Sequence, residues 1–144
     1  MVSMHILRYR VWPVIAGFGS ASLVMMALEC ASSFFYPLPQ GLDWSDTIAV
    51  QSFTASLPWT AYILVLCGWI LGSFVAGWMT TYFSGELKYR LSFLVGALLT
   101  IGGILNNIML GHNMFFNIVG LPMFLLFTYL GHRYHVSRTR GQFG

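Results

Sequence analysis

Glu29 is the one formal charge inside a long apolar stretch of this sequence, which runs from about Val11 to Tyr36. A charge in a membrane-spanning helix is costly, so such residues usually face the interior of a helix bundle and often mark an ion or proton pathway. Two roles are open for Glu29. It either binds a proton or a cation, or it is a protonated or hydrogen-bonded side chain that only fixes how the helices pack.

A group of polar side chains surrounds a predicted turn near residue 111, in the same outer third of the membrane as Glu29. Its members are Asn106, Asn107, His112 and Asn117. Unpaired amides are costly in lipid, so we expect several of these side chains to turn inward. With Glu29 they would form a polar pocket that opens to the outside. In the alternative interpretation the asparagines cap helix ends and His112 lies in a hydrated turn.

Gly68, Gly72 and Ala76 repeat at every fourth position in the second apolar stretch. Small residues at this spacing give a helix a flat face that a second helix can approach closely. We expect this row to be a helix-packing contact face.

Several chemistries find no support in the sequence. Cys30 and Cys67 lie in different apolar stretches and form no C-x-x-C pair. His132 and His135 lack a third metal ligand and are predicted to anchor the chain at the membrane boundary. No nucleophile and base pair, Walker loop or dinucleotide fingerprint is present. We therefore expect neither an enzyme nor a metal or cofactor site.

The elements that carry these residues are predicted from composition and run length. Of the 144 residues 57% are hydrophobic and 8% are charged, whereas a soluble domain carries about a quarter charged residues. A bilayer core needs about 20 apolar residues per helix. Four stretches reach that length, at about 11–36, 59–83, 91–110 and 113–130. The sequence predicts an all-α, polytopic membrane protein with four transmembrane helices in a single domain over residues 1–144.

Orientation follows from the basic residues. The segments on the other side of the predicted spans, residues 37–58 and 111–113, contain no Lys or Arg. All of the 7 Lys and Arg residues lie on one side: Arg8, Arg10, Lys88, Arg90, Arg133, Arg138 and Arg140. Cytoplasmic segments are rich in such residues, so both termini are predicted to be cytoplasmic. The short later connections favour an antiparallel bundle. A bacterial inner membrane fits this pattern, and an organelle membrane remains an alternative.

Two segments lie outside the predicted spans. The outer loop, residues 37–58, is expected to contain a short helix from Ser45 to Ser56, capped by Ser45 or Asp43, on the outer membrane surface. An irregular loop is the alternative for this segment. The cytoplasmic tail covers residues 131–144, and its basic part from Val136 to Gly144 is expected to lie against anionic lipid headgroups. The expected partners are the bilayer and other membrane helices, and no basic stripe indicates nucleic acid.

The combination of these motifs resembles a loose group of small uncharacterised bacterial four-helix membrane proteins. The resemblance rests on Glu29, on Tyr36-Pro37-Leu38-Pro39, on the Gly-rich second helix, and on Asn106 or Asn107 with His112. It covers the chain from about Val11 to Gly131 and implies no particular activity.

Two functions are predicted from these features. The first is an accessory or structural subunit that packs within a larger membrane complex or associates with copies of itself, using the Gly68, Gly72 and Ala76 face. The alternative is a small proton- or cation-coupled transporter or channel that uses Glu29 in a polar outer vestibule.

Overall fold

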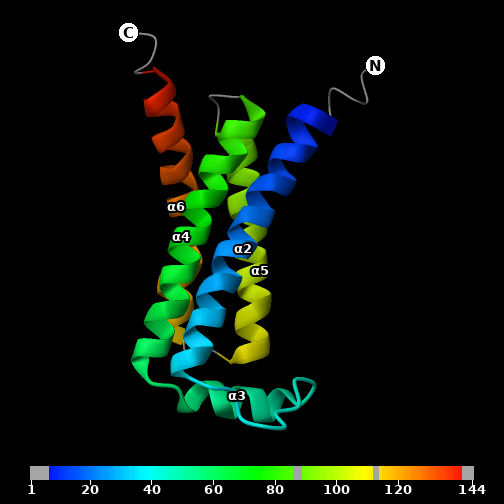
Figure 1. The fold of residues 1–144 in the computed structure, drawn as a ribbon, viewed down its shortest axis with the longest axis vertical. Coiled ribbons are helices and arrows are strands. Elements are labelled where there is room, and N and C mark those ends of the chain that lie inside the picture. Colours follow the sequence, from blue (N-terminus) through cyan, green and yellow to red (C-terminus); the bar gives the residue numbers. More distant parts are fainter. Residues whose placement is uncertain (1–6, 86–88, 112–113, 141–144) are drawn as a thin grey trace.

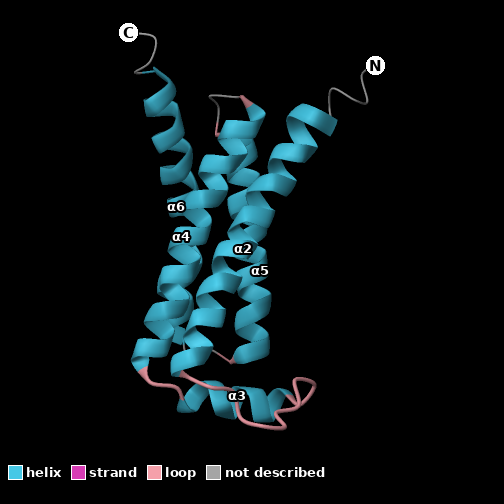
Figure 2. Cartoon of the chain, in the orientation of Figure 1, coloured by secondary structure: helices cyan, strands magenta, loops and turns pink. Residues whose placement is uncertain are grey.

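The computed structural model describes residues 7–85, 89–111 and 114–140. Within these ranges the chain forms helices and connecting loops and no strand (Figure 2). The elements are a short π-helical turn η1 (Leu7–Val11) and the α-helices α2 (Trp12–Phe35), α3 (Thr47–Ser56), α4 (Trp59–Ser84), α5 (Arg90–Leu110) and α6 (Met114–Arg140). The all-α prediction is confirmed for the described chain.

The four long helices run side by side, and α3 lies across one end of the bundle (Figure 1). We call this the α3 end. The beginning of α2 and the end of α6 both lie at the opposite end, which we call the terminal end (Figure 1). The α2 and α6 helices diverge there (Figure 1).

Three of the helical segments in the described chain are long and apolar enough to cross a membrane. They are Tyr9–Phe35, Trp59–Ser84 and Arg90–Leu110. These spans fit a multi-pass membrane protein. The fourth long helix, α6, has 27 residues and continues to Arg140, ten residues beyond the predicted end at 130. Part of the predicted tail is therefore an extension of this helix.

Local sequence explains where the helices begin and end. Asp46 caps α3, because its carboxylate accepts hydrogen bonds from the backbone N–H groups of Ile48 (3.0 Å) and Ala49 (3.1 Å). The expectation that Ser45 or Asp43 would cap this helix is wrong, since the helix starts at Thr47. Gly85 and Gly111 end α4 and α5 in the left-handed conformation, at φ of 62° and 66°, which glycine adopts without strain.

Helix α4 is central, and it contacts α2, α5 and α6. Its small-residue row lies against α2: a methyl group at Gly68 would touch Leu28, and one at Gly72 would crowd Met25 and the Ala21 carbonyl. Ala76 is fully buried. The predicted close approach is thus made within the chain, and α2 leaves this row no room for a separate protein.

Aromatic side chains fill the centre of the bundle between α4 and α6. Trp69 packs against Phe116 and Phe124, with ring centroids 5.0 and 4.8 Å apart, and Phe116 also contacts Tyr62 at 5.5 Å. All four side chains are buried. Large rings at these separations stabilise a bundle through contact area, and they hold the two helices at a fixed distance beside the site described next.

Candidate functional site

A cavity of about 430 Å³ lies at the α3 end, between the last turns of α2, the first turns of α4 and the end of α5. The loop before α3, together with α3 and the residue after it, covers the cavity from the end of the bundle through Trp44, Phe53 and Leu57. Its volume falls in the range of small-molecule sites, about 300–1,000 Å³.

The α2 wall supplies most of the polar groups. Glu29, Ser32, Ser33 and Tyr36 line the cavity, and their spacing places them on one face of the helix. The Tyr36 hydroxyl shares a hydrogen bond with the Thr60 hydroxyl at the start of α4. This contact joins the ends of α2 and α4 beside the cavity.

Two hydrogen bonds fix α3 over the cavity. The Tyr62 hydroxyl of α4 donates to the Thr54 carbonyl at 2.8 Å, and the Gln51 amide donates to the Ile108 carbonyl of α5 at 3.4 Å. Thr54 is buried, and Ile48 on the opposite side of α3 is 78% exposed. The helix is therefore held to both α4 and α5, as a cover over the space between them.

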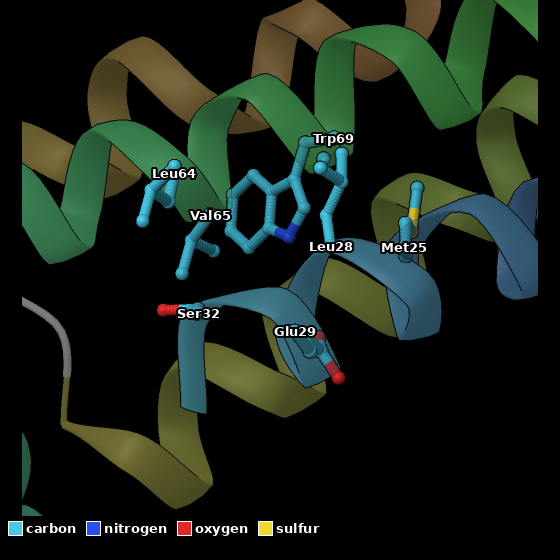
Figure 3. A pocket seen from close by; sticks show the side chains of 8 residues that line it. Met25, Leu28, Glu29, Ser32, Leu64, Val65 and Trp69 are labelled. Carbon is cyan, nitrogen blue, oxygen red and sulfur yellow. The ribbon is translucent and has the colours of Figure 1, made fainter. Parts of the chain in front are cut away.

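Glu29 lies on the wall of this cavity and is exposed. Its carboxylate makes no hydrogen bond or ion pair with any residue in the described chain. It also borders a second space of about 10 Å³ between α2 and α4, about the room that one water molecule needs. Figure 3 shows this smaller space, and there the Glu29 carboxylate points away from the Trp69 indole. Glu29 is thus available to a ligand.

The predicted polar cluster is divided in two. Asn106 lines the same cavity as Glu29, whereas Asn107 and Asn117 line a different cavity between α5 and α6. Successive residues of an α-helix point about 100° apart, so neighbouring amides on α5 face different helices. His112 lies outside the described residues. The expectation of a single pocket is therefore not met by the described members.

Charge is separated along the bundle. The α3 end carries Glu29, Asp43 and Asp46, and no Lys or Arg occurs between Arg10 and Lys88. Hydrogen bonds from the Ser45 hydroxyl and the Ser45 backbone N–H (2.7 and 2.8 Å) lower the pKa of Asp43, so that this carboxylate stays ionised. A surface of one sign raises the local concentration of counter-ions, which here are cations.

A second polar group, at the terminal end, was missed by the sequence analysis. His132 is 4% exposed, and its Nδ1 lies 2.9 Å from the Thr81 hydroxyl, which is 3.0 Å from the Ser92 hydroxyl. These side chains come from α6, α4 and α5. From the sequence, His132 was predicted only to lie at the membrane boundary; the structure adds that its side chain turns inward, toward α4 and α5.

Burial lowers the pKa of His132, and the nearby charges of His135 and Arg133 lower it further. Tyr89 lies beside it, with ring centroids 5.3 Å apart. The tyrosine pKa is raised by burial and by Tyr129, so the phenol stays neutral. A neutral, hydrogen-bonded group of this kind joins helices more readily than it binds ions.

Comparison of the chain with protein-family models, with curated protein sequences and with solved structures finds no match.

Proposed function

We propose that this protein binds an amphipathic organic cation in the cavity at the α3 end and carries it across the membrane, with Glu29 as the charge partner. The observation that supports the proposal is a carboxylate without a protein partner in the described chain, on the wall of a cavity of about 430 Å³. A carboxylate at this depth is costly unless a proton, a cation or water neutralises or solvates it.

The lining of the cavity fits the apolar part of an amphipathic cation. Trp44, Tyr36 and Tyr62 present aromatic surface, and the remaining wall is largely aliphatic. Cations bind to the faces of aromatic rings within about 6 Å of the ring centre. The hydrophobic part of the ligand removes apolar surface from water, while Glu29 and Asn106 interact with its polar part.

Glu29 also provides a means of coupling. A single carboxylate binds either a proton or the organic cation, so that one leaves when the other arrives. Transport would then be an exchange of a proton for the cation, with Glu29 occupied in both halves of the cycle.

Binding can be tested with two probes of the same shape and opposite charge, tetraphenylphosphonium and tetraphenylborate, added to the full chain in lipid nanodiscs. We expect the cation to bind more tightly than the anion. Glu29→Gln should weaken cation binding by about tenfold or more, the factor that corresponds to about 1.4 kcal/mol, and should leave anion binding little changed.

The matched control for this experiment is Asp46→Asn. It removes the same charge at the same end of the molecule and keeps an oxygen that caps α3. Equal cation affinity in the wild type and in Glu29→Gln would contradict the proposal, as would equal losses in the two variants.

The proposed topology is an antiparallel bundle of four spans in a bacterial inner membrane, with the first part of α6, to about residue 130, as the fourth span and both termini in the cytoplasm. Support comes from the length of α6, 27 residues, and from the grouping of the described Arg residues in the elements of the terminal end: Arg8, Arg10, Arg90, Arg133, Arg138 and Arg140. In this orientation the cavity lies at the outer end of the bundle, beneath α3.

A second proposed function is association with further membrane helices, as an accessory subunit or a homo-oligomer. One observation favours it: Gly102 of α5 is exposed, and a methyl group there would meet nothing within 4 Å. Extraction in mild detergent should then yield a particle with more protein than one chain of 16.2 kDa. A monomer in several detergents would contradict this second function and leave the first unaffected.

A further inference from the structure

A second cavity, of about 330 Å³, lies between α5 and α6. Ile104, Asn107 and Ile108 of α5 line one side of it, and Asn117 and Leu121 of α6 line the other. It shares none of these residues with the cavity that contains Glu29. The lining combines aliphatic surface with amide groups and includes no charged side chain.

Asn107 is the unusual member of this lining. It is 6% exposed, and neither its Nδ2 nor its Oδ1 has a hydrogen-bond partner among the described residues. A buried amide that lacks partners is strongly unfavourable, and more so in lipid, where water does not compensate. An amide in this state indicates that a molecule from outside the chain completes its hydrogen bonds.

The depth of Asn107 in the membrane indicates which chemical groups of that molecule lie beside the amide. Asn107 lies three residues before Leu110, the last residue of α5, which is about 4.5 Å along the helix axis. In a spanning helix this level is close to the polar boundary of the bilayer, where the hydroxyl and ester groups of lipids lie. Ile104 lies one turn deeper, where acyl chains run.

We propose that the cavity between α5 and α6 binds an uncharged lipid with one acyl chain and a hydroxyl-bearing head, of the monoacylglycerol class. A lipid hydroxyl donates to the Asn107 Oδ1 and accepts from its Nδ2, which satisfies both atoms. The acyl chain lies against Ile104, Ile108 and Leu121. A neutral head is favoured because no charged side chain lines the site.

The experiment uses the full chain, with ¹⁵N-labelled Asn side chains, in nanodiscs with and without 1-oleoylglycerol. We expect the Asn107 side-chain amide resonances to shift when 1-oleoylglycerol is added and to stay in place when hexadecane is added. Unchanged resonances with 1-oleoylglycerol would overturn the proposal and would fit a cavity that holds only water. Equal shifts with hexadecane would also overturn it, because an apolar chain alone would then account for binding.

Two variants complete the test. Asn107→Leu should weaken 1-oleoylglycerol binding by about tenfold, and it should raise the thermal unfolding midpoint of the lipid-free protein, because it removes a buried amide without partners. Asn106→Leu, the same change on the neighbouring residue, should keep the lipid response, since Asn106 faces the other cavity. A lower unfolding midpoint in Asn107→Leu, with lipid affinity unchanged, would show that the amide is structural and would also overturn the proposal.

Discussion

Glu29 and His132 are two titratable residues of this chain whose environments differ more than their sequence positions suggest. Both lie in or near apolar stretches. Glu29 is exposed on a cavity wall without a partner in the described chain, whereas His132 is buried and hydrogen-bonded to Thr81. The Glu29 carboxylate is therefore accessible to a ligand, whereas the neutral His132 ring joins helices through its hydrogen bond.

Stability should depend on pH through His132. Its folded pKa lies below the ordinary value of 6.5, so the unfolded chain binds more protons between those two values. The stability contributed by the neutral ring is complete above pH 6.5 and is lost as the pH falls through the lowered pKa. We expect the thermal unfolding midpoint to fall between pH 7 and pH 5, as measured in detergent by circular dichroism.

His132→Gln should reduce this pH dependence, because glutamine keeps a hydrogen-bonding group and does not titrate. His135→Gln is the matched control, since His135 is only half-buried and should leave most of the dependence in place. An identical pH profile in the wild type and in His132→Gln would contradict this assignment.

At the scale of helices, close crossings organise the bundle around α4. A methyl group at Gly77 would collide with the backbone carbonyl of Thr128, and one at Gly131 would collide with the carbonyl of Phe74. The α4 and α6 backbones therefore touch at two successive points. Membrane helices gain stability from such contacts because lipid does not drive them together.

Gly77→Ala should destabilise the fold by about 1–3 kcal/mol, the usual effect of overpacking, since the obstructing atoms are backbone and do not move aside. Unfolding in sodium dodecyl sulfate, followed by circular dichroism, measures this change. Gly102→Ala is the control. It has open space and should be neutral or more stable by up to about 1 kcal/mol, the helix-propensity difference between glycine and alanine. Equal losses of stability in Gly77→Ala and Gly102→Ala would contradict a close backbone contact between α4 and α6 at Gly77.

The cover helix α3 shows how an element gains its role from its neighbours. Its sequence favours a short surface helix, and Asp46 starts it. Its contacts with Tyr62 and Ile108 place it across the space between α4 and α5. An isolated helix of 10 residues is marginal in water, so these contacts also stabilise it.

At the scale of the whole molecule, the acidic residues of the described chain lie at the α3 end and its basic residues at the terminal end. This asymmetry sets the proposed orientation and attracts cations to the side on which the Glu29 cavity lies. The two proposed sites, one for a cation and one for a neutral lipid, lie on different faces of α5.

Cysteine labelling tests this orientation. In a chain without its natural thiols (Cys30→Ser and Cys67→Ser), a cysteine at the exposed position Ser45 should react with a membrane-impermeant maleimide in intact cells. A cysteine at the exposed position Ser137 should react only after the cells are permeabilised. The reverse pattern, or labelling of both sites from outside, would contradict the proposed topology.

Composition and run length alone determined that this chain is helical and contains helices able to cross a membrane. The reason is that a bilayer imposes a simple requirement, about 20 apolar residues with all backbone groups paired internally. The ends of α4 and α5 at Gly85 and Gly111 also have a local cause, because a left-handed turn favours glycine.

Tertiary structure decided which residues meet. The row of Gly68, Gly72 and Ala76 signals close approach but does not name the approaching helix, and α2 of the same chain provides it. Asn106 and Asn107 are neighbours in sequence, yet helix rotation directs them to different cavities. Side-chain direction and the identity of the facing helix depend on how whole helices pack, and these are long-range properties that no local pattern contains.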